Sequence, residues 1–229
     1  MRKVKESYKI MTPISKGGMR EMKRIEKIAR ICYKSEDKIS KDGSSAVQMV
    51  RMLVKKGHDA MLEHVSLSIK FTVDRGVSHE IVRHRIASYA QESTRYVNYS
   101  GAKAGNQCTF IDLWNGMQLD PKVSKLPKIQ QKEIYMEWIK AMEDAENHYL
   151  RMCYLGATPQ IARSVLPNST KTEIVMTANL REWRNFFRLR VPETAHPQMR
   201  EVTTKLYEEL SRKMPEIFNV FGDLEEVAA

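Results

Sequence analysis

The stretch 65–73 constrains the fold most, because apolar and polar residues alternate through it without a break. Val65, Leu67, Ile69, Phe71 and Val73 are apolar, and each residue between them is polar. Successive side chains of a β-strand point to opposite faces, so this period of two predicts a strand with one buried face. A sheet buries such a face against a second layer of structure, which the rest of the chain must supply.

That second layer is predicted to be helical. Apolar residues recur every three or four positions, as on one face of a helix, in the stretches 19–32, 44–56, 128–155, 183–189 and 197–213. The expected apolar side of the longest helix consists of Ile134, Trp138, Ala141, Ala145, Tyr149 and Met152. Ser44 and Ser45 are suited to cap the second helix and Gly57 to end it, while Asn179 followed by Glu182 resembles a capping box.

Weaker patterns complete the predicted elements. Ser78 is suited to cap a helix that runs past Ile81 toward Ile86, and Thr158-Pro159 opens a short helix over 161–165. A second strand is expected over 170–178, whereas 101–126 and the N-terminal stretch before Gly18 are expected to be irregular. Strands mixed with long helices, without a regular βαβ alternation, indicate an α+β fold. We expect a mixed, largely antiparallel sheet flanked by long helices, in a single domain over 1–229.

The net charge and the cysteines limit the function. The chain carries 38 Lys and Arg against 28 Asp and Glu, a formal charge of +10, which favours an anionic partner such as nucleic acid, a membrane surface or a phosphorylated metabolite. No apolar run approaches the roughly 18 residues of a membrane span. The start of the chain lacks the apolar core of a secretory signal, so we expect a cytoplasmic protein.

Cys32, Cys108 and Cys153 are widely spaced, which argues against disulfides or a cysteine zinc site.

Polar and aromatic side chains are concentrated in 83–96, which reads RHRIASYAQESTRY. Arginine offers a fork of donors suited to phosphate and carboxylate, serine and glutamine add neutral hydrogen bonds, and tyrosine can stack on a planar ring. Together these residue types favour a phosphorylated, ring-bearing ligand such as a nucleotide. A solvated basic helix end explains the composition equally well, so the order of the residues has to decide.

That order resembles a known signature. Arg83-His84-Arg85, followed after seven residues by Ser93, matches the motif of the flavin-dependent thymidylate synthases. Further similarities follow in the family's order and extend the resemblance over 29–202: His58 with Glu63-His64, the stretch 162–167, Asn179-x-Arg181, Asn185 and Leu189-Arg190. The sequence departs from the family at Ala60 and Cys32, which replace hydroxyl residues, and His196 does not align with a histidine that some relatives have in the active site.

The resemblance implies a role for each matching residue. The residues expected to bind FAD are His58, Arg83, His84, Arg85, Gln91, Asn179, Leu180, Arg181 and Asn185. Those expected to bind deoxyuridylate (dUMP) are Glu80, Arg83, Gln91, Glu92, Ser93, Thr94, Arg95, Arg163 and Arg190. Arg190 and Ser93 are the expected catalytic pair, with Arg190 on the edge of the uracil ring and Ser93 as an orienting partner.

The resemblance also implies the reaction and the assembly. The expected activity is reductive methylation of dUMP to dTMP, with 5,10-methylenetetrahydrofolate as carbon donor and FAD reduced by NAD(P)H, in practice NADPH. A homotetramer with shared active sites is expected, without nucleic acid, membrane or metal. Cysteine-dependent synthases add an activated thiolate to C6 of uracil. Because no cysteine here has such a setting, activation by the charge of Arg190 is expected instead.

Three other interpretations stay open from the sequence. The basic balance and the arginine- and tyrosine-rich segment are compatible with a nucleic-acid-binding protein, although no recognised binding motif occurs. A cysteine-dependent synthase and a flavin-binding module without turnover are the other two. A metal site at His58 and His64, or at His79 and His84, is disfavoured because neither pair has i, i+4 spacing and no HExxH motif occurs.

Overall fold

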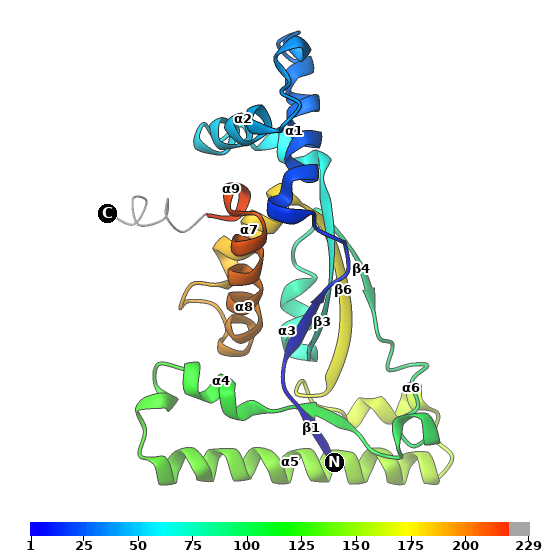
Figure 1. Ribbon diagram of the computed structural model, residues 1–229. Coiled ribbons are helices and arrows are strands. Elements are labelled where there is room, and N and C mark those ends of the chain that lie inside the picture. Colours follow the sequence, from blue (N-terminus) through cyan, green and yellow to red (C-terminus); the bar gives the residue numbers. More distant parts are fainter. Residues whose placement is uncertain (220–229) are drawn as a thin grey trace.

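The computed structural model describes residues 1–219 and is built around an antiparallel sheet (Figure 1). Four strands form this sheet in the order β2-β3-β6-β4, with bounds Ser7–Ile10, Ser66–Asp74, Lys171–Asn179 and Ala87–Gln91. A smaller parallel sheet pairs β1, Arg2–Val4, with β5, Thr109–Ile111. The predicted α+β class with a mixed, largely antiparallel sheet in a single domain is confirmed.

The two long strands β3 and β6 form the centre of the sheet. They pair along their whole length, from Ser66 opposite Asn179 to Asp74 opposite Lys171. The alternate residues Leu67, Ile69 and Phe71 are buried, as the period of two predicts. Since the residues between them are not buried, this sheet has one covered face and one open face.

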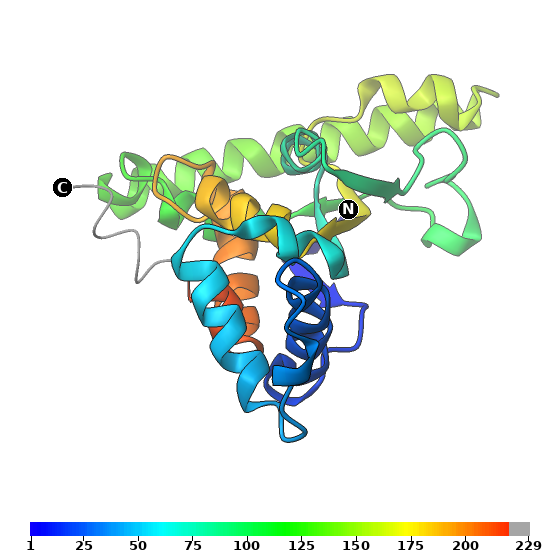
Figure 2. The same cartoon turned by 90° about the horizontal axis from the view of Figure 1, so that it is seen from above.

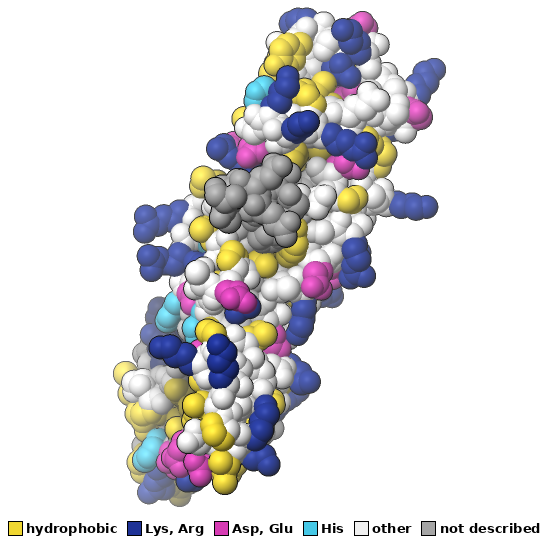
Figure 3. All heavy atoms as spheres, turned by 90° about the vertical axis from the view of Figure 1, so that its left-hand side faces the viewer, with side chains coloured by type: hydrophobic (Ala, Val, Ile, Leu, Met, Phe, Trp, Pro, Cys, Tyr) yellow, Lys and Arg dark blue, Asp and Glu magenta, His cyan; other side chains and the backbone are white. Residues whose placement is uncertain are grey.

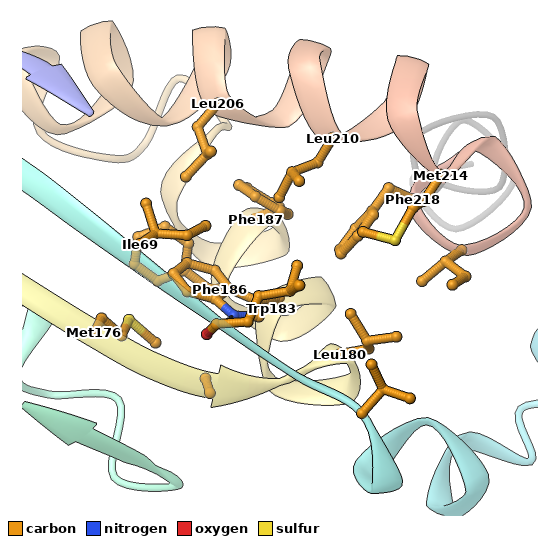
Figure 4. Packing of buried hydrophobic residues seen from close by; sticks show 14 of the residues in the cluster. Ile69, Met176, Leu180, Trp183, Phe186, Phe187, Leu206, Leu210, Met214 and Phe218 are labelled. Atoms are coloured by element: carbon orange, nitrogen blue, oxygen red, sulfur yellow. Dashed lines mark hydrogen bonds between the residues drawn. The ribbon is translucent and has the colours of Figure 1, made fainter. Parts of the chain in front are cut away.

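Helices cover the face that carries those buried residues. The covering helices are α3, Arg75–Ile81, α7, Leu180–Arg190, and α8, Pro197–Lys213 (Figure 1). In Figure 4, Phe187 of α7 lies below Leu206 of α8, and Phe186 and Trp183 of α7 lie next to Ile69 of β3. The side chains of all five are fully buried. Burial of several large apolar side chains fixes how α7 lies against the sheet, and α7 carries many of the expected site residues.

The remaining helices lie at the two ends of the sheet. At one end α1, Met19–Ile31, and α2, Ser44–Lys55, run side by side (Figure 2), and the short α9, Pro215–Phe218, contacts α2 (Figure 1). At the other end α5, Lys128–Tyr154, crosses beside α4, Leu113–Leu119, and α6, Pro159–Ala162 (Figure 1). Short 3₁₀ turns are η1 Lys16–Gly18, η2 Glu36–Lys38, η3 Asp59–His64, η4 Ala102–Ala104, η5 Val123–Lys125 and η6 Arg163–Val165.

Two predicted helix starts are wrong, because in each case the N-cap is a residue that precedes the expected serine. α3 begins at Arg75, and the side chain of Asp74, not Ser78, accepts from the backbone N–H of Val77 over 2.6 Å. α2 is preceded by Gly43 with φ of 89°, and neither expected serine cap makes a capping bond. A positive φ is easily adopted by glycine, so the chain turns there without a side-chain cap.

Other corrections concern segments expected to be helical or irregular. α3 ends at Ile81 instead of running toward Ile86, and 87–91 form β4, which edges the sheet. The irregular stretch 101–126 contains β5 and α4, and the N-terminal stretch contains β1 and β2. On α5, the expected apolar positions Ile134 and Ala141 are exposed. The short strands β1, β2, β4 and β5 and the helix α4 pair or pack with distant parts of the chain, and local periodicity does not reveal such partners.

Several predicted boundaries are confirmed. Gly156 has φ of 96° after α5, as expected for a residue that ends a helix, and Pro159 is the first residue of α6. The side chain of Asn179 accepts from the backbone N–H of Glu182, which is one half of the expected capping box. Within 1–219, no helix is long and apolar enough to cross a membrane. The predicted domain also includes 220–229, which lie outside the described residues.

Candidate active site

The Arg-His-Arg segment lies in the turn between α3 and β4. Of its residues only His84 is buried, while Arg83 and Arg85 are exposed. The Tyr89 hydroxyl on β4 donates to the backbone carbonyls of Ile81, over 2.9 Å, and of His84. These two hydrogen bonds hold the turn in place, so that the imidazole points into the protein and the two guanidinium groups point outward.

His84 is the centre of a polar network that reaches α7. Its Nδ1 lies 2.7 Å from the Glu182 carboxylate, and its Nε2 accepts from Nε of Arg190 over 3.1 Å. The edge of the Phe186 ring packs against the imidazole, with ring centroids 4.8 Å apart. Burial lowers the pKa of His84 and the Arg190 charge lowers it further, whereas Glu182 opposes the shift. His84 is therefore neutral near neutral pH.

Arg190 is anchored on its other side by Glu80 of α3. One terminal nitrogen of the guanidinium lies 2.8 Å from the Glu80 carboxylate, and the other donates to the Glu80 backbone carbonyl over 3.2 Å. The Arg190 side chain is 18% exposed, so it is held on several sides yet reachable from solvent. A fixed cation at a partly open site is suited to stabilise negative charge on a ligand.

A pocket of about 320 Å³ opens beside this network, between η3 and the start of α7. It is lined by Asp59, Glu63, Ile86, Asn179, Arg181, Glu182, Asn185 and Arg188. The predicted residues Asn179, Arg181 and Asn185 therefore come together here. Leu180 is buried in the core and offers only its backbone, and His58 is exposed just before η3, outside the pocket lining.

The chemistry of this pocket fits part of a flavin dinucleotide. Its amide and guanidinium groups suit phosphate and carbonyl oxygens. The carboxylate oxygen Oδ1 of Asp59 is buried and has no hydrogen-bond partner within 1–219, which leaves an acceptor for a ligand hydroxyl or N–H. Glu63 is neutralised by Arg181, with N and O 2.5 Å apart. Ligand pockets usually measure about 300–1,000 Å³, so one chain supplies space for a portion of such a large cofactor.

The remaining predicted residues gather at the far end of β4. The Gln91 side chain donates to Ser78 over 2.9 Å, and Glu92 receives bonds from Lys171 over 2.7 Å and Tyr99 over 3.1 Å. The loop that follows β4 has its Thr94 hydroxyl 3.2 Å from the guanidinium of Arg163.

The loop after β4 borders a pocket of about 830 Å³. Glu92, Tyr96, Lys103 and Lys171 are among its lining residues. Ser93 is half-buried at the start of this loop, Thr94 is buried and Arg95 is exposed. The backbone N–H of Arg95 donates to the Ser93 hydroxyl over 3.3 Å. The loop is therefore held by its own hydrogen bonds and by Arg163, and the exposed Arg95 guanidinium lies over the Tyr96 ring, 5.5 Å from its centroid.

The expected catalytic pair is not brought together within one chain. Arg190 lies against His84, before β4 begins, and Ser93 follows its last residue, Gln91. Five residues of β-strand span about 13 Å from first to last Cα. Among residues 1–219 no hydrogen bond or ion pair joins the two groups. The predicted residues therefore form two separate half-sites, which we call the His84 half-site and the Ser93 half-site.

Sequence reasoning missed two residues of these half-sites. Glu182 was read only as part of a capping box, yet its carboxylate bonds to His84 and Asn185. The spacing Asn179-x-x-Glu182-x-x-Asn185 places all three near one helix face and could have signalled a shared role. Lys171 carried no signal, because its bond to Glu92 depends on the pairing of β6 with β4.

The cysteines differ in their settings. Cys32 is exposed, Cys108 is buried and Cys153 is intermediate, and all three are free thiols. Burial, with a smaller contribution from the Glu146 carboxylate, raises the pKa of Cys108 to about 12. In the described part of the chain, no group of three or more His, Cys, Asp or Glu side chains is placed to hold a metal ion.

With this arrangement in view, comparison with known proteins identifies the family. The family model described as thymidylate synthase complementing protein matches residues 18–216. Flavin-dependent thymidylate synthases of Mycolicibacterium vanbaalenii and Corynebacterium glutamicum are 31% and 33% identical to this chain over 198 and 209 residues. These matches cover 86% and 88% of this chain and 78% of each relative.

A solved structure shows the same fold. A UMP/dUMP methylase, PolB from Streptomyces cacaoi, bound with 5-Br dUMP, superposes with a TM-score of 0.76 at 22% identity and covers 97% of both chains. Family model and relatives together define a methyltransferase enzyme. The chain belongs to the flavin-dependent thymidylate synthases, which confirms the family that the motif predicts.

Proposed function

We propose that the protein converts dUMP to dTMP in the cytoplasm, with 5,10-methylenetetrahydrofolate as carbon donor and NADPH as reductant. The observation that carries the proposal is the half-buried Arg190 guanidinium, fixed by His84 and Glu80 beside a pocket suited to part of FAD. Overall, the methylene carbon becomes the methyl group of dTMP, tetrahydrofolate is released and NADPH is oxidised to NADP⁺. When bound, FAD supplies the two-electron chemistry of this conversion.

The His84 half-site would hold the flavin. Asn179, Arg181 and Asn185 line its pocket with donors, and the exposed Arg83 and Arg85 lie on the turn that contains His84. His84 would contribute through its position in the network, and Leu180 through its backbone. His58, just ahead of η3, lies next in the chain to the lining residue Asp59.

The Ser93 half-site would hold the nucleotide. Arg95 and Arg163 offer guanidinium groups for the phosphate, one at the surface and one bonded to Thr94. The Ser93 hydroxyl, the Gln91 amide and backbone N–H groups of the loop are suited to orient the base and sugar. Glu92 would shape the loop through its bonds to Lys171 and Tyr99.

Activation of the uracil ring would be electrostatic. Carbon C5 becomes nucleophilic as negative charge moves onto a ring carbonyl, and a fixed guanidinium lowers the energy of that charge. Arg190 would supply this guanidinium, with Glu80 holding its terminal nitrogens. A thiolate would not be required, in line with the high pKa of the buried Cys108 thiol. Ser93 would orient the ring, since a serine without a neighbouring base is a poor nucleophile.

A complete active site would then need more than one copy of the chain. The half-sites lie at opposite ends of β4, and exposed apolar side chains lie near each. Val82, Ile86 and Leu189 flank the His84 half-site, whereas Tyr96, Ile161 and Val165 lie near the Ser93 half-site. Pairing of unlike half-sites from different copies would cover these side chains, which supports a homotetramer with shared active sites.

The net charge gives less support to nucleic-acid binding. On the face shown in Figure 3, Lys and Arg side chains are spread from one end of the molecule to the other, with Asp and Glu between them. Several arginines are also engaged in ion pairs, for example Arg30 with Glu26 and Arg51 with Glu216. A nucleic-acid groove would instead collect unpaired cations along one stripe.

The first experiment is to record the visible absorption of the purified protein and then to follow NADPH oxidation with and without dUMP. Flavin bands, NADPH oxidation that responds to dUMP, and dTMP formed only when methylenetetrahydrofolate is added would support the whole proposal. Bound flavin without formation of dTMP would indicate a flavin-binding module without turnover. A colourless protein that takes up no FAD would overturn the proposal and make salt-dependent nucleic-acid binding the next measurement.

A further inference from the structure

Glu182 lies at the centre of the His84 half-site but belongs to none of the motif positions. It is on the first turn of α7 and is 7% exposed. One carboxylate oxygen lies 2.7 Å from Nδ1 of His84, and both oxygens lie 3.3 Å from the amide nitrogen of Asn185. A buried carboxylate so closely bonded to an imidazole controls which ring nitrogen carries the proton.

The protons of the network can be assigned from its donors. Arginine is always protonated in proteins, so Nε of Arg190 always carries a hydrogen. This N–H points at Nε2 of His84 over 3.1 Å, so Nε2 must present a lone pair. The proton of the neutral imidazole therefore sits on Nδ1 and is donated to Glu182. Only this tautomer satisfies both contacts.

Every other protonation state of His84 would push Arg190 away. In the Nε2–H tautomer and in the imidazolium, an N–H of His84 would face the N–H of Arg190 in a buried setting. Such opposed donors cost the hydrogen bond between Arg190 and His84, and the Nε2–H tautomer also loses the bond to Glu182. Because burial and the Arg190 charge lower the pKa of His84, the imidazolium is disfavoured, and Glu182 acts mainly by choosing between the neutral tautomers.

The other groups around His84 keep the array in place. Glu80 on α3 binds both terminal nitrogens of Arg190, and the Tyr89 hydroxyl on β4 holds the backbone of His84. Each terminal nitrogen of a guanidinium has two hydrogens, and Glu80 takes one from each. Two N–H groups of Arg190 thus have no acceptor within 1–219, on a side chain that is 18% exposed.

We propose that Glu182 is a positioning residue for the reaction: it holds His84 as the Nδ1–H tautomer, and His84 in turn holds Nε of Arg190, so that the terminal N–H groups are available to the uracil ring. The inference rests on the proposed role of Arg190 in methylation. It also makes a statement about protons in the resting protein, which can be tested without any turnover.

The direct test is nuclear magnetic resonance of protein labelled with ¹⁵N-histidine, loaded with FAD, at neutral pH. Wild type and Glu182→Gln are expected to show His84 with its proton on Nδ1, because the Gln carbonyl can still accept. Glu182→Leu is expected to move the proton to Nε2 or to give a mixture. Glu63→Gln is the matched control, since it removes a carboxylate from the same pocket without touching His84.

The kinetic test uses the same variants at saturating FAD, so that loss of the Asn185 contact is compensated. Glu182→Leu is expected to lower kcat by about 10- to 100-fold, the usual effect of losing an outer partner that orients a functional group, with a smaller change in KM for dUMP. Glu182→Gln is expected to retain most of kcat. In this variant, the decrease of kcat on the acid side of the pH profile (the acid limb) should occur at lower pH, because loss of the carboxylate charge lowers the pKa of His84 further.

The outcomes separate this inference from the proposed function. If wild type makes no dTMP, the proposed function fails, and the tautomer measurement still decides the role of Glu182. If wild type is active but Glu182→Leu keeps both the Nδ1 proton and wild-type kcat, the inference is overturned. If Glu182→Leu does not fold, Glu182→Gln provides the test. An acid limb of kcat at the same pH as in wild type would then overturn the inference.

Discussion

Ser93 and Arg190 lie toward opposite ends of β4: Arg190 is bonded to His84 before the strand begins, and Ser93 follows the residue that ends it. The five-residue strand that lies between His84 and Ser93 in the chain spans about 13 Å from its first to its last Cα. A substrate that contacts both residues would therefore bind where the His84 half-site of one copy meets the Ser93 half-site of another. This separation gives the proposed assembly a direct test.

Mixed oligomers should recover activity from two inactive variants. Arg190→Ala damages the His84 half-site, and Arg163→Ala damages the Ser93 half-site. When the two are co-expressed in equal amounts, roughly a quarter of the sites should combine two intact halves from different copies and regain activity.

The control for complementation pairs Arg190→Ala with Arg85→Ala. Both changes lie in the same half-site, so every copy of that half-site stays defective and no activity should return. Activity of purified mixed oligomers, separated by two different affinity tags, is the measurement. If the first pair forms mixed oligomers but stays as inactive as the control, each site lies within one chain.

Arg190 and Arg85 should have separable functions. Arg190→Ala is expected to lower kcat by about 10²- to 10³-fold, as for loss of an oxyanion-stabilising donor, while flavin stays bound. Arg85→Ala is expected to weaken flavin retention, because Arg85 extends outward from the turn beside the flavin pocket. Flavin absorbance after gel filtration and dTMP formation measure the two effects. Normal turnover of Arg190→Ala would show that the residue does not activate uracil.

Asn179 should combine a structural and a binding function. Its side chain accepts from the backbone N–H of Glu182 over 2.8 Å and caps α7. Asn179→Ala is expected to lower stability by about 1 kcal/mol, the usual cost of losing such a cap, and also to weaken flavin binding. Asn179→Asp should keep the cap and the stability while its charge weakens flavin binding. Urea denaturation and flavin titration distinguish the two, and equal stability of all three proteins would contradict the capping role.

The three cysteines should be dispensable for the chemistry. Burial raises the pKa of Cys108 to about 12, so its thiolate is scarce at neutral pH, and Cys32 and Cys153 have no neighbouring base bonded to them among the described residues. A variant with all three replaced by alanine is expected to keep kcat within about threefold of wild type. If the variant folds and binds flavin and dUMP but forms no dTMP, the reaction depends on a cysteine.

Glu6 should make the protein less stable as pH rises. Burial, and after it the nearby Glu201 and Asp74, raise the pKa of Glu6 from 4.5 to about 9, and among the described residues neither of its oxygens has a hydrogen-bond partner. The folded state therefore keeps a proton that the unfolded state releases above pH 4.5. Between these two values stability should fall by up to about 1.4 kcal/mol per pH unit.

Glu6→Gln removes that titration and tests it. The variant should match wild type near pH 5 and exceed it by roughly 1–3 kcal/mol near pH 8.5, with Glu133→Gln on the exposed side of α5 as control. Urea denaturation at both pH values provides the comparison. A difference between Glu6→Gln and wild type that does not change with pH would rule out the buried proton.

The sequence predicted the parts of the fold whose cause is local. The alternation of 65–73 fixed β3 and its buried face, and Asn179 with Glu182 fixed the start of α7. These signals are local because a strand face repeats every two residues and a cap acts within three. By contrast, β4 was not predicted: the helix before it was expected to run toward Ile86, and the five residues that follow become a strand only through pairing with β6.

For the site, the sequence alone determined the family and predicted the residues that bind ligands, because residue types in a fixed order preserve a chemistry. Only the tertiary structure decided how those residues are grouped. It separated Arg190 from Ser93 by the length of β4 and placed Glu182, 98 residues away along the chain, against His84. Such contacts arise because packing on the sheet brings α7 against the turn after α3, and no local pattern in either segment records that meeting.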